Sequence, residues 1–393
     1  MIRTIFVYAP FAVGLLIMFG LVFPNCRQLQ LRTRTQAIWA MVILFCCSKF
    51  LCFKAFGGDE FTPDLPALVI WIWDWLYSGA IILAALALLT VFFRFRAKLW
   101  VLPILAWGLA AWGLYNGFSA PAVHEVELAY SDLPASLDGY RIVQLSDLHC
   151  SSAARRWRTQ AVVEKTNALQ PDLICLTGDL ADGKASRIAR HLEPIKELRA
   201  KDGVYACTGN HEYYHDYYGW MTHFYAKAEN IRLLENECAF PHEGLALAGV
   251  PDEAGFRHCG IVGERDWWQS FDAATNGEFR VLMCHRPKDV VQYVRECDVR
   301  LQLSGHTHGG IAPLLSTLVK LHNGGYVRGL YPAPGRSGER YLYVSPGSGQ
   351  WAGFPMRFFN PSEITLITLR LKSGRRQTSS SRAAMRSRHA SRM

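Results

Sequence analysis

Residues 142–149 read IVQLSDLH, a short apolar run that ends in an aspartate and a histidine. Short runs rich in Val, Ile and Leu are typical of buried strands. Asp147 and His149 therefore lie just past the end of a predicted strand. Open α/β sheets build their sites outside the carboxyl ends of strands. This stretch thus predicts both a core strand and the beginning of a polar site.

The same sequence of strand and polar motif recurs four times further along the chain. Apolar runs lie at residues 173–176, 204–207, 281–284 and 299–303. The polar motifs at their ends are GDLAD at 178–182, GNHE at 209–212, CHR at 284–286 and GHTH at 305–308. Helices are predicted at 155–169, 186–200 and 219–230. This alternation of strands and helices favours an α/β layered domain.

The chain of 393 residues divides into three parts. Residues 1–120 contain long apolar stretches and predict an N-terminal transmembrane α-helical bundle of about four spans. Residues 121–371 have the composition of a globular α/β protein and are numerous enough to bury a large core. Residues 372–393 contain seven Lys or Arg and no Asp or Glu. We therefore expect residues 372–393 to form a basic disordered tail.

The predicted spans lie at residues 4–24, 37–53, 67–93 and 99–118. Each approaches or exceeds the roughly 20 residues that a bilayer requires, although Lys49 interrupts the second. Basic residues follow the first and third spans, whereas Asp59, Glu60 and Asp64 follow the second. The positive-inside rule then predicts a multi-pass inner- or plasma-membrane protein whose residues 121–371 are extracytoplasmic. Asp74, near the outer end of the third span, is interpreted as interfacial, and Lys49 is expected either to snorkel or to pair with it.

Seven motif residues are of types that bind metal ions, and none of them is a thiolate. They are Asp147, His149, Asp179, Asn210, His285, His306 and His308. Carboxylate, amide and imidazole ligands together suit Mn, Fe, Zn or Ni, and we favour Mn. Two such ions placed close together can clamp the attacking and leaving oxygens of a phosphoryl transfer. The motifs therefore predict two divalent metal ions as cofactors.

Taken together, the five motifs resemble those of the calcineurin-like metallophosphoesterase superfamily, in the family's order. The resemblance extends over about residues 137–371. The flanking stretches LDGYRIVQLSD at 137–147, SPGSG at 345–349, PMR at 355–357 and PSEI at 361–364 look like those of the membrane-anchored bacterial phosphoesterases. The resemblance implies a β-sandwich flanked by helices as the fold of this α/β domain.

The resemblance also implies a role for each site residue. Asp179 would bridge two metal ions, and a hydroxide between the ions would be the nucleophile. His211 would protonate the leaving oxygen or stabilise the developing charge. The first ion would be held by Asp147, His149 and His308, and the second by Asn210, His285 and His306.

Other residues of the motifs have less definite roles. Asp182 is interpreted either as a support for the ligands or as a helix cap, and Glu212 as a support for its loop. Arg286 could contact phosphate or carry a surface charge. Arg357 is a candidate for phosphate recognition, because a guanidinium offers a fixed fork of donors.

These features predict a metal-dependent phosphoesterase that hydrolyses a phosphodiester or pyrophosphate. Aromatic residues crowd 213–220 and 351–359. Beside a membrane-tethered site they suggest a lipid-linked or envelope substrate, so the expected partners are the bilayer and a phosphorylated small molecule or lipid. Ordinary packing of these rings is the alternative interpretation.

Three other functions stay open at this point. A UDP-2,3-diacylglucosamine pyrophosphatase of lipid A synthesis would require a cytoplasmic site, against the predicted topology. A non-enzymatic transport or signalling module with a sensor domain would not need the full set of ligands. A nuclease has only the basic tail in its favour, and residues 121–371 are not basic enough to suggest a nucleic-acid partner.

Overall fold

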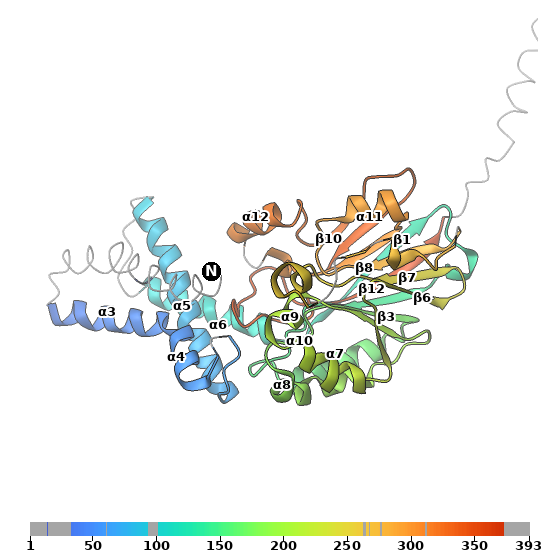
Figure 1. The fold of residues 1–393 in the computed structure, drawn as a ribbon. Helices are drawn as coiled ribbons and strands as arrows, with labels where there is room; N and C mark the ends of the chain where they lie inside the picture. The colour runs from blue at the N-terminus through green and yellow to red at the C-terminus, as the bar shows by residue number, and fades with distance from the viewer. Residues whose placement is uncertain are drawn as a thin grey trace, which may run out of the picture.

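The computed structural model describes residues 14, 33–59, 61–92, 101–261, 265–266, 268–275, 277–310 and 313–372. Helices α3–α6 lie at one end of the molecule, and a domain of two sheets with outer helices lies at the other (Figure 1). We call the second part, residues 122–372, the sandwich domain. The predicted boundaries of the three parts of the chain stay a prediction.

Each of the two sheets has six strands and mixes parallel with antiparallel pairs. The first sheet has the order β1 (Ala122–Tyr130), β12 (Glu363–Leu371), β2 (Arg141–Leu145), β3 (Leu173–Thr177), β4 (Val204–Cys207) and β5 (Ile231–Leu233). The second has the order β10 (Gly329–Pro332), β11 (Tyr341–Val344), β9 (Leu301–Ser304), β8 (Phe279–Met283), β7 (Leu245–Gly249) and β6 (Glu237–His242). Strands β2 to β5 run parallel, as do β7, β8, β9 and β11. All five motif-bearing strands therefore belong to these two parallel blocks.

A shared apolar core holds the two sheets face to face. Ile142 and Leu173 of the first sheet belong to one buried cluster with Val281 and Leu301 of the second. Strands buried on both faces are expected to be almost continuously apolar, and β3 is buried at all five positions. The apolar runs that predicted the strands thus have this burial as their cause.

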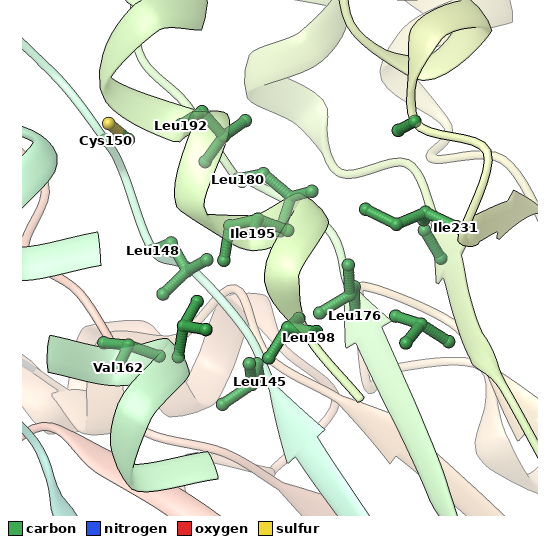
Figure 2. Close-up of a cluster of buried hydrophobic side chains, with 14 of the residues drawn as sticks. Leu145, Leu148, Cys150, Val162, Leu176, Leu180, Leu192, Ile195, Leu198 and Ile231 are labelled. Carbon is green, nitrogen blue, oxygen red and sulfur yellow. The ribbon is translucent and has the colours of Figure 1, made fainter. Parts of the chain in front are cut away.

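Helices cover the outer face of each sheet. Leu145 and Leu176 pack with Val162 of α7 and Leu192 of α8 in a second buried cluster (Figure 2). On the other sheet, Leu282 packs with Tyr293 of α11. The helices of the sandwich domain are α7 (Arg156–Ala168), α8 (Ala185–Leu192), α9 (Asn210–His215), α10 (Tyr217–His223), α11 (Val290–Cys297) and α12 (Pro313–His322). This confirms the predicted α/β layered domain, and the structure shows that its two sheets are mixed.

The N-terminal helices are α3 (Thr33–Cys47), α4 (Lys49–Gly57), α5 (Ala67–Phe92) and α6 (Val101–Phe118). Among the described residues, α5 and α6 are long and apolar enough to cross a membrane. The second predicted span is a pair of helices, α3 and α4, that meet at a bend of 58°. The first predicted span falls outside the described residues except for residue 14, and the basic tail falls outside them beyond residue 372.

Polar contacts tie these helices to the sandwich domain. The buried guanidinium of Arg158 on α7 donates to the carbonyl oxygens of Gly117 and Ser119 at the end of α6, each at 3.3 Å. Trp71 on α5 donates to the carbonyl oxygen of Ala153, and Arg155 donates to that of Leu65 in the loop before α5. The loop between α4 and α5 therefore contacts the sandwich domain, and the extracytoplasmic orientation stays a prediction.

Candidate metal centre

The predicted ligands come together at one edge of the sandwich. Asp147 and His149 follow β2, Asp179 follows β3, and Asn210 begins α9 just after β4. His285 follows β8, and His306 and His308 follow β9. Because both sheets turn the carboxyl ends of these strands to the same edge, ligands from the two sheets face each other. Figure 1 shows α9 at the end of the sandwich that faces α4 and α6.

Five of these residues have an uncommon backbone conformation. Asp147, His149, Asp179, His306 and His308 all have φ between 45° and 69°. Residues other than glycine rarely adopt this left-handed region, and each such position costs of order 1–3 kcal/mol. The tight turns direct successive side chains into the centre. Such a concentration of positive φ at one edge is typical of a functional site.

The ligand atoms form neighbouring groups. Asp147, His149 and His308 make one group, and Asp179, His285 and His306 make another, each with its ligand atoms within 4.8 Å of one another. Asp179 Oδ2 lies 3.8 Å from His149 Nε2 and 3.2 Å from His285 Nε2. Asp179, a member of the second group, therefore also lies next to the first group.

Some ligand atoms are buried without a hydrogen-bond partner. Among the described residues, Asn210 Oδ1 and His285 Nε2 have none. An unpaired buried polar atom costs about 1–3 kcal/mol. At His285 the other ring nitrogen contacts the Thr177 carbonyl oxygen at 2.8 Å, which orients Nε2 towards Asp179. This donor set, with its orphaned atoms, fits bound divalent cations.

Asp182 contacts two histidines of the site. Its Oδ1 lies 2.9 Å from His149 Nδ1 and 2.6 Å from His211 Nδ1. Both rings are thus held by Nδ1, and the Nε2 atom of each lies within 4.0 Å of Asp179 Oδ2. Of the two interpretations of Asp182, support for the ligands is the one that agrees with this geometry.

We expect Asp182→Asn to lower kcat/KM for a phosphodiester by about 10- to 100-fold, the usual effect of removing such a supporting carboxylate. The reason is that both imidazoles contact the same oxygen, Oδ1, and an amide lacks the negative charge with which the carboxylate attracts them. Steady-state kinetics with metal content measured on the same samples would test this. A loss smaller than threefold would contradict the role of Asp182.

The electrostatic environment differs among the histidines. Burial would lower the pKa of His211, but the carboxylates of Asp179 and Asp182 outweigh it and raise the pKa to about 9. The pKa of His306 lies well below its usual value, mainly because the ring is buried and secondly because the Arg286 guanidinium is close. The pKa of His308 is also well below its usual value, mainly because of burial and secondly because His149 is close. His306 and His308 are therefore neutral imidazoles near pH 7, the form that binds metal.

Glu212 supports the loops that carry the ligands, as predicted. Its carboxylate accepts from the backbone N–H groups of Gly209, Asp179 and Leu180 at 2.8–3.1 Å. These bonds join the end of β3 to the start of α9. Glu212 thus fixes the spacing of Asp179 and Asn210 without being a ligand.

Asp252 is a site residue that was not predicted. It is buried and its carboxylate binds Arg286 through two hydrogen bonds, from Nε at 2.8 Å and from Nη2 at 3.2 Å. Arg286 Nη1 then lies 3.1 Å from His306 Nε2. The signal was present in the sequence, because Asp252 follows β7 at the same edge of the sheet.

Arg357 does not have the surroundings expected of a phosphate ligand. Its guanidinium is buried and donates to the carbonyl oxygens of Pro346 and Gly349 at 2.8 and 2.6 Å, and to Gln350 Oε1 at 2.9 Å. Because these donors are already engaged inside the protein, the structure argues against a direct contact with substrate. Arg357 instead braces the loop before β12.

An α/β sandwich with Asp, Asn and His ligands gathered at its strand ends defines the class of metal-dependent phosphoesterases. Residues 140–310 match the family model of the calcineurin-like phosphoesterases. The chain belongs to this family, and the sequence resemblance is confirmed. The family assignment supports a metal-dependent phosphoesterase and hydrolase that binds divalent metal ions.

Relatives occur in animals and bacteria. A transmembrane protein with metallophosphoesterase domain from Danio rerio is 35% identical over 67% of this chain and 60% of its own length. An uncharacterized metallophosphoesterase from Helicobacter pylori is 31% identical over 65% of this chain and 66% of its own length. Another from Aquifex aeolicus is 30% identical over 59% of this chain and 85% of its own length. The chain thus matches about three fifths of the Danio rerio protein's length. Relatives named as transmembrane proteins and the apolar helices α5 and α6 agree with attachment to a membrane.

Proposed function

We propose that this protein hydrolyses a phosphodiester or pyrophosphate of a lipid-linked or envelope substrate with two divalent metal ions. The observation that carries the proposal is the position of Asp179 between two groups of ligand atoms. One ion would be held by Asp147, His149 and His308, and the other by Asn210, His285 and His306, with Asp179 shared. Manganese suits this mixture of oxygen and imidazole ligands.

The metal ions, His211 and Asp182 have separate roles in the proposed reaction. When bound, the ions supply Lewis acidity and lower the pKa of water. His211 Nε2 lies 4.0 Å from Asp179 Oδ2, so the ring borders the ligand groups without belonging to the proposed ligand set. Asp182 fixes the ring through Nδ1. His211 is therefore placed to give a proton to the leaving oxygen.

Arg286 replaces Arg357 as the proposed phosphate contact. Asp252 fixes its guanidinium from one side, and Nη1 reaches the ligand His306. The side chain keeps 15% of its surface exposed, so a substrate can reach it. A guanidinium held in this way presents its remaining donors to phosphoryl oxygens.

We expect Arg286→Lys to raise KM and lower kcat/KM by about 10-fold or more, because one charge-assisted hydrogen bond contributes about 1.5–3 kcal/mol. The matched control is Arg265→Lys. Arg265 also pairs with Asp252, but its other groups bind Asp289 and the Pro251 carbonyl oxygen. Equal changes in KM for the two variants would contradict a phosphate contact at Arg286.

Exposed apolar side chains near the site support a lipid-linked substrate. Phe359 is 74% exposed and contacts Trp112 of α6. Leu318 and Leu321 of α12 are 56% and 73% exposed, and α12 follows closely on the ligand His308. Figure 1 shows α12 on the part of the sandwich domain that faces the N-terminal helices. An apolar rim beside membrane helices suits an acyl chain or the bilayer surface.

The charges of the loops support an inner- or plasma-membrane protein whose catalytic domain is extracytoplasmic. A reporter enzyme that is active only outside the cytoplasm, fused after residue 372, would test this orientation. An active fusion is the expected result. A fusion active only with a cytoplasmic reporter would reverse the orientation.

The experiment that tests the reaction uses the full chain in detergent. We expect hydrolysis of bis(p-nitrophenyl) phosphate with Mn²⁺, its loss with a chelator and its recovery when Mn²⁺ is restored. The matching monoester should be a poorer substrate. A higher kcat/KM for the monoester would reject the diester class, and no turnover with Mn, Zn, Ni or Fe would reject the proposed hydrolysis of these esters.

A further inference from the structure

A buried ion pair lies in the N-terminal helices, apart from the metal ligands. Lys49 Nζ of α4 lies 2.6 Å from Asp74 Oδ1 of α5, and both side chains are almost completely buried. Among the described residues, Asp74 Oδ2 has no hydrogen-bond partner. Asp74 is therefore buried within the protein, and of the two roles considered for Lys49, pairing with Asp74 is the one that the structure shows. Burying such a pair costs several kcal/mol per ion, so stability alone is a weak reason for its presence.

Lys49 also reaches the sandwich domain. Its Nζ donates to the carbonyl oxygen of Ala352 at 2.9 Å, across 303 positions of sequence. The rings of Phe50, Phe53 and Tyr77 surround the ammonium at 4.9–5.4 Å, and such faces attract a cation. One buried ammonium thus binds a carboxylate in the helical end and a backbone oxygen in the sandwich domain.

The loop that contains Ala352, residues 345–357, runs directly against the ligands. A Cβ added to Gly349 would lie 1.9 Å from the Leu148 carbonyl oxygen, so only glycine permits this approach. A Cβ added to Gly347 would lie 3.0 Å from Asp147 Cβ. Arg357 holds the loop from inside the domain, and Lys49 holds it from the helices.

Trp351, next to Ala352, connects this loop to His211. The two rings meet edge to face with centroids 6.0 Å apart. Trp351 also stacks on Phe61 of the α4–α5 loop, with ring centroids 6.1 Å apart, and the Phe61 ring lies 5.2 Å from that of Phe50. The ring contacts therefore run without a break from α4, beside Lys49, to the proposed proton donor.

We propose that Lys49 and Asp74 are positioning residues for the phosphoesterase site. Asp74 fixes the ammonium of Lys49, and Lys49 fixes the 345–357 loop, which holds Trp351 against His211. The helical part of the chain thus shapes the active site in addition to attaching it to a membrane. The activity readouts of this proposal rest on the proposed function, whereas its readout of loop order does not.

The decisive variant removes both charges together in the full-length protein. Lys49→Met with Asp74→Leu leaves no unpaired buried charge, and such apolar replacements are often neutral or stabilising. We expect an unchanged or higher Tm and a kcat lower by about 10- to 100-fold, because small displacements of a catalytic group have effects of this size. Lys49→Arg, which can still bind both Asp74 and Ala352, should retain most of the activity. Lys54→Met on the exposed side of α4 is the matched control and should resemble the wild type.

Two further measurements separate positioning from a purely structural role. Hydrogen exchange should rise in residues 345–357 of the double variant while the sandwich strands remain protected, and this readout needs no turnover. The losses caused by Lys49→Met and Trp351→Ala should be non-additive, since both act on the same loop.

The opposite results would overturn the proposal. They are unchanged exchange in residues 345–357, additive losses for Lys49→Met and Trp351→Ala, or a fall in kcat that follows a matching fall in Tm. If the wild type hydrolyses no phosphoester, the proposed function fails, and hydrogen exchange alone still decides whether Lys49 orders the loop.

Discussion

Asp179→Asn should lower kcat/KM for a phosphodiester by about 10³-fold or more. The carboxylate lies within 4 Å of His149, His211 and His285, so its charge acts on both groups of ligands. Loss of one bound ion removes several kcal/mol of transition-state stabilisation, and each 1.36 kcal/mol is a factor of ten. Steady-state kinetics and metal analysis of the same preparation would measure the effect, and the expected metal content falls by at least one ion per chain.

Asp179 Oδ1 accepts a hydrogen bond from the backbone N–H of His211 at 2.8 Å. The asparagine side chain has the same shape, and its amide oxygen can still accept this hydrogen bond. A change in fold is therefore not the expected cause of inactivity, and an unchanged thermal transition in the presence of chelator would verify this. Asp272→Asn, at an exposed position, is the matched control. Activity within tenfold of the wild type would exclude Asp179 as the shared ligand.

The positions of the ligands followed from the sequence because one physical rule governs all of them. Strands buried on both faces are continuously apolar, so their ends are visible, and polar residues just past those ends meet at one edge of a sheet. Asp252, which was not predicted, follows β7 in the same way. The left-handed backbone of Asp147, His149 and Asp179 has no comparable signal, because Asp and His also occupy ordinary conformations.

The role of Arg357 could not be predicted from the sequence pattern alone. A guanidinium near a phosphate site can bind substrate or brace a loop, and only the surrounding carbonyl oxygens decide between them. The second predicted span shows the same limit. The hydropathy of this stretch predicted a span that Lys49 interrupts. The 58° bend and the hydrogen bond from Lys49 to Ala352 depend on tertiary packing. Local pattern identified the polar residues, whereas their partners depend on the tertiary fold, as for Lys49 and Ala352, which are 303 positions apart.

His211→Gln should reveal the role of His211 through the leaving group. For a substrate whose leaving group is an alkoxide, we expect kcat to fall by about 10²- to 10⁴-fold, which is the usual contribution of a general acid. For bis(p-nitrophenyl) phosphate the loss should be much smaller, because nitrophenolate needs no proton to leave. The measurement is the ratio of the two losses in one variant, so differences in protein quality cancel.

The contacts of the His211 ring agree with the proposed acid role. Asp182 holds Nδ1 at 2.6 Å, Trp351 borders the ring, and Nε2 is left facing Asp179. His223→Gln, on the exposed surface of α10, is the control and should leave both rates unchanged. Equal losses for the two substrates would show that His211 stabilises the developing phosphoryl charge, since that task does not depend on the leaving group.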